Sequence, residues 1–360
     1  MRVRPLLAAL LATAAKPVIG GQAVIEGVMM RSPKSFAVAV RRPDGGIVVR
    51  EEAWLSFAER FPILRWPILR GANMLVESLY NGLLALSFSA ATAFPDDEAA
   101  KTEHEKAEKA KKEGGAALWV TLAISMGFAF ALFKGVPHLT AWGLGEWLAE
   151  GGQSALPMTS PLFHLVDGAV KLGIFVGYIA LISRMNDVKR LFMYHGAEHK
   201  SVHVWEADEP LDVEHARPKT TAHPRCGTSL LLLVIATSMF VFAAVLPFVP
   251  TVFENGFFQA LFMLAVKLPL LLPIAGLAYE AQRLAAKNPG NALVRAVIAP
   301  GMLLQRMTTR QPGDAELEVA LAALKKAVWR EGHREKPQSQ ATVEVFADFA
   351  AVDQQIRHAA

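Results

Sequence analysis

Cysteine is almost absent from this sequence. Cys226 is the single cysteine among 360 residues, so the chain cannot form an intrachain disulfide. In a reducing compartment its thiol is free to serve as a thiolate ligand. A strong excess of one charge sign is also missing, because the formal net charge of +4 is spread over several polar segments. This distribution indicates membrane topology and contact with anionic lipid, and it argues against a nucleic-acid partner.

Charged side chains are also scarce in four long apolar stretches. The stretches are residues 116–133, 162–183, 230–249 and 257–278. They contain three charged residues in all, Asp167, Lys171 and Lys267. Each stretch is close to the roughly 20 residues that cross the hydrocarbon core of a bilayer. Together with a hydrophobic fraction of 52%, they predict a mainly α-helical, polytopic membrane protein with about four transmembrane helices.

Basic residues are distributed unevenly over the segments that join these stretches. Five lysines lie between positions 101 and 112, and seven Lys or Arg residues lie between positions 184 and 225. The segment after the first stretch carries only Lys134 before its acidic residues, and the turn near Glu254 carries no basic residue. By the positive-inside rule, both chain termini and the 184–227 loop should face the cytoplasm.

The region before the first stretch has a different pattern. Residues 23–30, 35–42 and 47–54 are apolar-rich and partly alternating, with a Pro-Asp-Gly-Gly turn at 43–46, which predicts a small antiparallel sheet. Residues 73–94 are helix-like and apolar but interrupted by Glu77 and Asn81, and we expect this segment to lie in the membrane interface.

These patterns divide the chain into seven segments. They are a β/α region (1–94), a charged linker (95–115), spans one and two (116–183), a cytoplasmic His/Cys loop (184–227), spans three and four (228–279), a cytoplasmic region (280–332) and a mobile polar tail (333–360). Leu317, Leu321, Leu324 and Val328 predict an amphipathic helix before the tail. The first fifteen residues resemble a short signal peptide. Because export of the amino terminus conflicts with the loop charges, we expect an ordinary helix or a start codon assigned too far upstream.

Half of the chain's ten histidines lie in the 184–227 loop, together with Cys226. His195 and His199 are four residues apart, so on a helix both imidazoles can reach one ion. Glu198 borders the same face, where a carboxylate can act as general base, and His-x-x-Glu-His is also the inverted zinc-peptidase order. His203 would lie on the same side of the helix, but about 12 Å from His195 along the helix axis. We therefore expect it to be an alternative ligand or a residue that supports a ligand.

A second pair of donors follows at His223-Pro-Arg-Cys226. Cys226 directly precedes the third span, and the amino end of a helix favours the thiolate that a metal needs. His195 and His199 completed by either His223 or Cys226 would leave one position open for water, whereas both together would close the site. Nitrogen, sulfur and carboxylate donors together indicate a divalent metal, with zinc the first choice. His215, beside acidic residues, fits a surface position.

Polar residues elsewhere leave alternatives open. Glu26 lies in an apolar strand, where it either faces solvent or points at the cytoplasmic site. Three charged residues lie within predicted spans, namely Asp167, Lys171 and Lys267. An unpaired charge there costs several kcal/mol. The simple explanation for their presence is an ion pair among them, and the alternative is a transport pathway. A transporter with four spans would need to form a homo-oligomer.

At these residues the chain resembles the YqhQ-like family of bacterial membrane proteins. The matching motifs are GGQAVIEGVMMRSP (20–33), YHGAEHKSVH (194–203), HPRCGT (223–228) and PGMLLQRMTTRQPGDAELEVALAAL (300–324). The likeness spans about residues 17–330. It implies a bacterial plasma-membrane location and a metal-dependent protein, and it names no reaction.

The sequence thus favours a zinc-dependent hydrolase at the cytoplasmic membrane face. His195 and His199 would hold the metal with His223 or Cys226, and Glu198 would activate water. A membrane scaffold or assembly factor with a structural metal is the first alternative, and it predicts that all four ligands bind. A transporter built on Lys267, Asp167 and Lys171 is the second.

Overall fold

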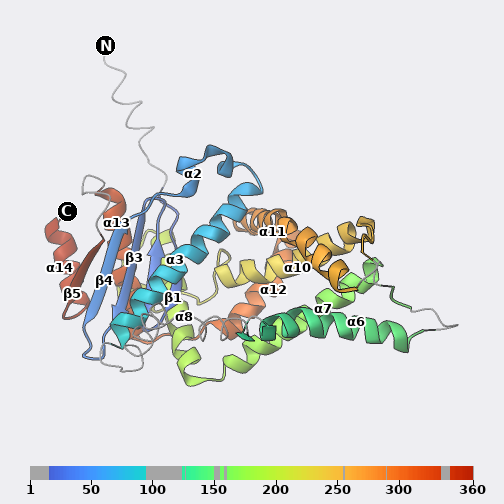
Figure 1. Ribbon diagram of the computed structural model, residues 1–360. Helices are drawn as coiled ribbons and strands as arrows, with labels where there is room; N and C mark the ends of the chain where they lie inside the picture. The colour runs from blue at the N-terminus through green and yellow to red at the C-terminus, as the bar shows by residue number, and fades with distance from the viewer. Residues whose placement is uncertain are drawn as a thin grey trace, which may run out of the picture.

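A computed structural model shows a mainly α-helical protein with one five-stranded sheet (Figure 1). It describes residues 16–94, 124–125, 127–149, 155–157, 160–253, 256–288, 290–333 and 341–359. The signal-like start, the charged linker and much of the predicted first span lie outside these residues. The sheet and its covering helices form one end of the molecule, and a helical bundle forms the other.

The sheet is an antiparallel meander in the order β1-β2-β3-β4-β5. Its strands are β1 (Gly20–Val24), β2 (Gly27–Arg31), β3 (Ser35–Arg41), β4 (Ile47–Ala53) and β5 (Thr342–Phe346). The prediction of one strand over 23–30 is wrong, because the chain reverses there and β1 pairs with β2. Glu26 takes a left-handed φ of 51° in this tight turn. The next residue, Gly27, has no room for a side chain, because a Cβ there would lie 2.3 Å from the Ala39 carbonyl oxygen.

Helices cover both faces of the sheet. On one face α8 (Asn186–Glu206) contacts β1 and β2, and α13 (Asp314–Gly332) contacts β2, β3 and β4. Val28 and Met30 of β2 point into this layer, whereas Met29 points to the opposite face. There α3 (Leu69–Ala93) packs on β1–β3. The alternation of strand side chains therefore fills two apolar layers, and α13 is the predicted amphipathic helix.

The carboxyl-terminal tail is part of this fold. Residues 342–346 form β5, which pairs with β4 at the edge of the sheet, and α14 (Phe349–Ala359) packs against α13. The prediction of a mobile tail is therefore wrong for these residues. Lys326 of α13 is buried and pairs with Glu344 of β5, so the edge strand is fixed by a charge as well as by its ladder.

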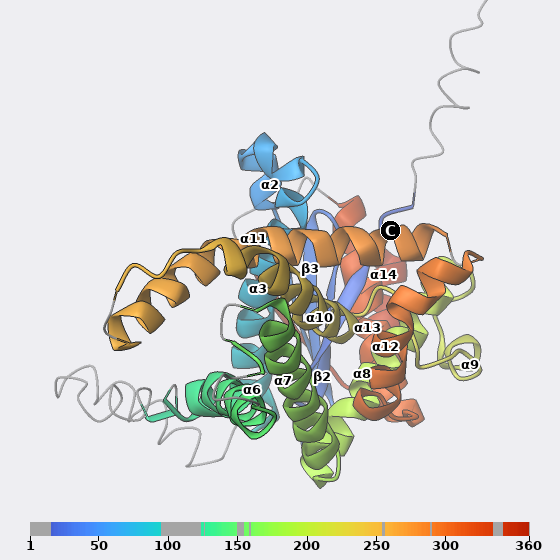
Figure 2. The ribbon, with the colours of Figure 1, turned by 90° about the vertical axis from the view of Figure 1, so that its right-hand side faces the viewer.

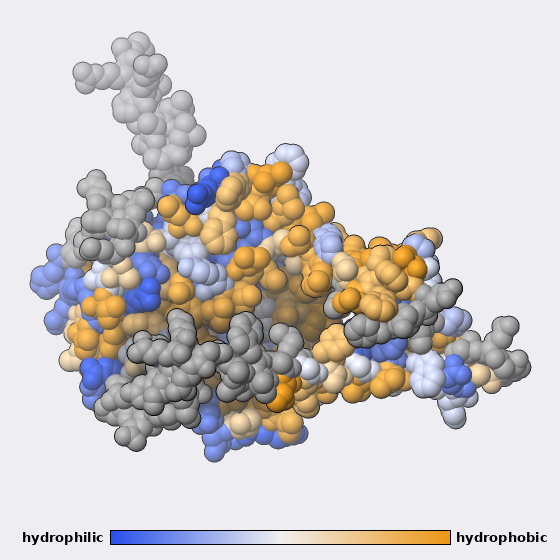
Figure 3. Space-filling model, viewed as in Figure 1, coloured by the Kyte–Doolittle hydropathy of each residue, from blue (hydrophilic) through white to orange (hydrophobic). Residues whose placement is uncertain are grey.

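The bundle contains three of the predicted spans. The corresponding helices, α7 (Pro161–Ile182), α10 (Gly227–Val245) and α11 (Gly256–Lys287), are long and apolar enough to cross a membrane. Figure 2 shows them in front of the sheet, and Figure 3 shows hydrophobic residues over much of this half. Exposed side chains such as Phe240, Leu268 and Leu272 suit contact with lipid.

The fourth helix of spanning length is α3, which corresponds to the segment expected in the membrane interface. Its first turns meet α11, where Gly71 would place a Cβ 2.8 Å from the Cα of Gly276. Farther along, Ala85 and Ala93 pack on the sheet. Because its inner face is covered by the sheet and its outer face carries exposed Leu79 and Leu83, the interfacial placement stays our prediction.

Shorter elements complete the chain. They are α2 (Phe57–Arg60), η1 (Pro62–Arg65), the π-helical turn η2 (Ala131–Gly135), α6 (Val136–Trp147), α9 (Val213–Ala216), η3 (Leu246–Phe248) and α12 (Ala292–Thr308). The described part of the predicted first span runs through η2 into α6. α12 packs against α10 and leads into α13, so it joins the bundle to the sheet.

Candidate metal centre

The predicted histidine pair lies on a buried part of α8. Every residue from Tyr194 to Val202 is buried, because one side of the helix faces the sheet and the other faces α12 and the loop that follows α8. His195 is 8% exposed and His199 is 1% exposed. Their ring centroids are 4.5 Å apart, as two imidazoles one helical turn apart require.

Backbone carbonyls fix which nitrogen of each ring carries the proton. Nδ1 of His195 lies 2.7 Å from the Thr308 carbonyl oxygen, and Nδ1 of His199 bonds the Thr221 carbonyl oxygen. Because a carbonyl can only accept, both Nδ1 atoms donate, and in the neutral form of each ring Nε2 then keeps a lone pair. This is the arrangement in which a protein orients histidines that bind a metal.

Cys226 supplies a third donor at the same place. Its Sγ lies 3.3 Å from Nε2 of His195 and 3.0 Å from the Thr228 hydroxyl. Cys226 also lies directly before the first residue of α10, at the amino end of that helix. One donor atom from each of His195, His199 and Cys226 lies within 4.8 Å of the others.

Two glutamines hold the turn that carries Cys226. The side chain of Gln305 on α12 accepts from the His223 backbone N–H and donates to the His223 carbonyl oxygen, both at 2.8 Å. Gln282 on α11 donates to the carbonyl oxygens of Pro224 and Cys226. The helices α11 and α12 thus set the position of the thiol, and sequence patterns gave no signal for either glutamine.

Glu198 lies beside the three donors. Its Oε2 is 3.4 Å from Nε2 of His199, and the residue is 5% exposed. Gly21 of β1 makes room for it, because a Cβ at that position would lie 2.6 Å from Cγ of Glu198. Nε2 of His199 is buried and has no hydrogen-bond partner among the described residues. A buried lone pair of this kind is costly unless something binds it.

A second group of possible donors, His203, Glu206 and His223, lies beside the first. The sequence patterns did not predict that Glu206 belongs to it. One donor atom of each lies within 4.8 Å of the others, and the rings of His203 and His223 are 4.7 Å apart. Nε2 of His223 lies 3.4 Å from Glu206, which also pairs with Arg225. The hydrogen bond from His223 and the charge of Arg225 hold the pKa of Glu206 below its ordinary value, against the effect of burial.

The remaining predicted residues lie apart from the donors. Glu26 pairs with Arg190 and accepts a hydrogen bond of 3.2 Å from Tyr194, so it anchors the β1–β2 turn to α8. His215 is partly exposed and bonds Asp212, which fits the expected surface position. The sequence left His223 and Cys226 as alternatives for the third donor. In the structure Cys226, and not His223, groups with His195 and His199.

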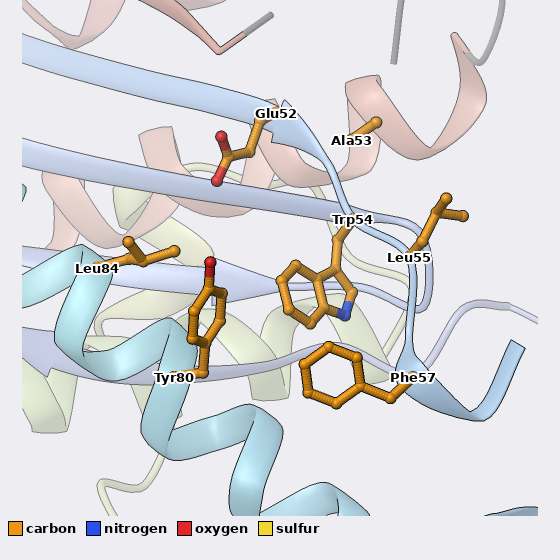
Figure 4. A pocket seen from close by; sticks show the side chains of 7 residues that line it. All are labelled: Glu52, Ala53, Trp54, Leu55, Phe57, Tyr80 and Leu84. Carbon is orange, nitrogen blue, oxygen red and sulfur yellow. The ribbon is translucent and has the colours of Figure 1, made fainter. Parts of the chain in front are cut away.

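A cavity of about 460 Å³ lies on the other face of the sheet (Figure 4). Trp54, Phe57 and Tyr80 line it together with Glu52 at one edge. The ring centroids of Phe57 and Tyr80 lie 6.1 and 6.0 Å from that of Trp54, so the rings contact each other. No predicted site residue lines this cavity, and we assign the candidate site to the His/Cys cluster.

Comparison with known proteins places the chain in a family. The family model described as "Protein of unknown function (DUF1385)" matches residues 66–330, which include every donor of the cluster. The chain belongs to the DUF1385 family. It is also 30% identical over 329 residues to "Uncharacterized protein YqhQ" of Bacillus subtilis (strain 168), covering 89% of this chain and 96% of that protein. No solved structure matches the chain.

This result confirms the resemblance drawn from the motifs. The DUF1385 match begins after the first four strands, so the GGQAVIEGVMMRSP segment lies outside it, although the likeness to the Bacillus protein extends over most of the chain. Neither description names a metal or a reaction. The chemistry of the site therefore has to be argued from its own geometry.

Proposed function

We propose that this protein is a zinc-dependent hydrolase at the cytoplasmic face of the bacterial plasma membrane. The observation that carries the proposal is the convergence of two histidine Nε2 atoms and one cysteine Sγ, with the Glu198 carboxylate beside them. Three protein ligands and an adjacent carboxylate are the arrangement of catalytic zinc sites.

The donor set fits a borderline-soft divalent ion. Two imidazoles whose Nδ1 protons are held by backbone carbonyls present their lone pairs to one point, and the thiol contributes a soft donor. The unpartnered Nε2 of His199 supports the same assignment, because an ion would satisfy it. Zinc accepts this mixed set more readily than magnesium or calcium, which prefer oxygen ligands.

Glu198 has the position of a general base. His195, His199 and Cys226 would hold the divalent ion, which would supply the Lewis acidity that makes water a nucleophile near neutral pH. The carboxylate of Glu198 would accept the proton that the attacking water gives up, and it lies close enough to the His199 ligand atom for that role. Burial of Glu198 between α8 and β1 holds it in place for this step.

The site lies where the bundle meets the sheet. Cys226 lies directly before α10, and Gln282 of α11 donates to its carbonyl oxygen, so the thiol lies at the ends of two candidate spans. The basic residues of the 184–227 loop support a cytoplasmic orientation for this end.

The alternative is a scaffold with a closed structural metal. It requires a fourth protein ligand, for which His223 was the candidate. The ring of His223 instead lies 3.4 Å from Glu206 and 5.7 Å, between centroids, from that of His199. This geometry favours the open, catalytic arrangement.

Elemental analysis of detergent-purified protein tests the proposal. We expect about one zinc per chain in the wild type. His199→Ala should lose it, whereas Glu198→Gln and the surface variant His215→Ala should keep it. Screens of ester, peptide and phosphoester hydrolysis should then show activity in wild type and His215→Ala and none in Glu198→Gln. A wild type without zinc after zinc is supplied would refute metal binding, and equal activity in Glu198→Gln would refute the assigned base.

A further inference from the structure

The chain between β4 and α3 forms a protruding apolar loop, residues 55–68. It contains α2 and η1, and Figures 1 and 2 both show it standing out at the edge of the molecule. Neither α2 nor η1 has a buried residue. Six large apolar side chains of the loop are exposed, namely Leu55, Phe57, Phe61, Ile63, Trp66 and Ile68. So many exposed apolar groups in a short segment indicate an interaction surface.

The 55–68 loop ends in a close contact with a candidate span. Ile68 is the centre of a rare γ-turn with a φ of 72°. Gly276 of α11 lies against this turn, because a Cβ there would be 2.4 Å from the Ile68 carbonyl oxygen. Directly after the turn, Arg70 pairs with Glu280 of α11. These contacts with α11 therefore fix the position of the loop relative to the bundle.

The contact lies at one boundary of the apolar part of α11. After Lys267 the helix is free of charge as far as Tyr279, and Glu280 is the next charged residue. Gly276 precedes Glu280 by about one helical turn, or about 6 Å. Leu277, next to Gly276, is exposed. The loop therefore lies near the depth at which the hydrocarbon core ends and the headgroups begin.

The metal centre lies at the same end of α11. Gln282, two residues beyond Glu280, donates to the Cys226 carbonyl oxygen at 2.9 Å. The basic residues of the 184–227 loop favour the cytoplasmic side for this end. The leaflet next to the 55–68 loop is therefore the cytoplasmic one.

The backbone of the loop suits the headgroup region rather than the hydrocarbon core. Pro62 and Pro67 interrupt it, and α2 and η1 are each only four residues long. In a short, broken segment many peptide groups need water as a partner, which the headgroup region supplies and the hydrocarbon core does not.

The side chains of the loop fit an anionic lipid surface. Arg60 and Arg65 are exposed, and neither forms an ion pair with a carboxylate of the described residues. Arg65 donates to the Ala58 carbonyl oxygen, and the guanidinium of Arg60 lies 5.8 Å from the Phe61 ring centroid. Tryptophan and phenylalanine beside arginine are typical of segments that lie in the membrane interface. Figure 3 shows hydrophobic and charged residues together over this protrusion.

We propose that the 55–68 loop is a membrane anchor. It inserts Phe61, Ile63 and Trp66 into the cytoplasmic leaflet and places Arg60 and Arg65 at the phosphates of anionic phospholipids. Lipid is the occupant of this apolar surface, because the surface adjoins the exposed part of α11 at the membrane boundary and carries arginines. Since the loop follows β4 directly, its insertion holds the sheet, with α8 and its metal donors, next to the bilayer.

Fluorescence quenching of labelled full-length protein in vesicles tests the anchor. Cys226 is buried, so a thiol-reactive bimane reports on an introduced cysteine, and wild type measures the background. Ile63→Cys places the label in the loop. Val343→Cys on β5 is the matched control, because Ile63 and Val343 are both β-branched and are 55% and 54% exposed. The vesicles contain phosphatidylcholine with phosphatidylglycerol. One quencher is a nitroxide on the lipid acyl chain, and the other is iodide on both sides of the membrane.

We expect the label in Ile63→Cys to be quenched by the nitroxide lipid and protected from iodide, and the label in Val343→Cys to behave in the opposite way. Trp66→Cys should repeat the result at a second exposed position of the loop. A label in the loop that is as open to iodide as the control would overturn the proposal. Protection from both quenchers would also overturn it, because protein, such as a second copy of the chain, would then cover the loop.

Lipid charge tests the part assigned to the arginines. In the Ile63→Cys background, Arg60→Gln and Arg65→Gln should each lower the ratio of protected to iodide-accessible label by about five-fold. Arg217→Gln, at an exposed position on the far side of the metal centre from α11, is the control for loss of one positive charge. Vesicles of phosphatidylcholine alone should abolish the difference between the variants and their parent. Equal iodide access in all variants and both lipids would overturn the contact with lipid phosphate. None of these results bears on zinc binding.

Discussion

Nε2 of His195 lies 3.3 Å from Sγ of Cys226, although 31 residues separate them in the chain. The contact brings α8 of the sheet layer against the first turn of α10 in the bundle. Both atoms would be ligands to one ion, so a metal at this point would join the two halves of the molecule.

Replacement of Cys226 and His223 separates the two possible ligand sets. Cys226→Ala should lower zinc affinity by about 100-fold or more, because the thiolate is one of three converging donors. His223→Ala should lower it far less, since the ring is directed at Glu206. Competition with a zinc chelator measures both affinities. Equal losses in the two variants would favour a closed, four-ligand site.

Substitution of Gly21 should displace Glu198. In Gly21→Ala the new Cβ would lie 2.6 Å from Cγ of Glu198 and 2.7 Å from the Met29 carbonyl oxygen. We expect a loss of about 1–3 kcal/mol in the free energy of unfolding and a reduced hydrolytic rate at unchanged zinc content. Gly20→Ala is the matched control, because nothing lies within 4 Å of its Cβ position. A Gly21→Ala variant as active and stable as Gly20→Ala would contradict the tight packing of β1 on α8.

Gln305 should act on the metal centre as a positioning residue. Gln305→Leu removes both hydrogen bonds to the His223 backbone and one of 2.6 Å to the Ser229 hydroxyl. Zinc affinity should fall by about 10- to 100-fold, as is usual when a residue that orients ligands is lost. Gln311→Leu, at an exposed position of the same region, should keep wild-type affinity. Chelator titration of both variants provides the comparison.

Acid should weaken the attachment of α14. Burial alone would raise the pKa of Asp353, but hydrogen bonds from Lys325 and Arg357 outweigh it and hold the pKa below its ordinary value. A carboxyl with a depressed folded pKa stabilises the fold above the unfolded pKa of about 3.9, and this contribution disappears as the pH falls through the folded value. Because Asp353 is partly exposed, we expect about 0.5–1 kcal/mol at neutral pH.

Unfolding of wild type and Asp353→Asn at neutral pH and near pH 3 measures that contribution. The variant should be less stable at neutral pH, and the difference should shrink in acid. A difference that is constant with pH would show that the pair with Lys325 does not depend on ionisation of Asp353.

Local sequence patterns predicted correctly those elements whose structure depends on a single segment of the chain. The apolar stretches that form α7, α10 and α11 could be recognised from their length and their scarcity of charge alone. The stripe of Leu317, Leu321 and Leu324 likewise identified α13 and its buried face. The strand boundary at Glu26 could not be found this way, because an apolar run looks the same whether it is one strand or a two-strand hairpin.

The sequence by itself determined that this is a mainly α-helical membrane protein of the DUF1385 family, and it predicted that His195, His199 and Cys226 belong to one site. These inferences rest on composition and on the spacing of residues within short motifs, and neither depends on the fold. Only the tertiary structure places Cys226, rather than His223, beside the histidine pair, puts Glu206 in a neighbouring group and completes the sheet with β5. Each of these depends on contacts between side chains far apart in the chain, and such contacts exist only once the helices and the sheet have packed.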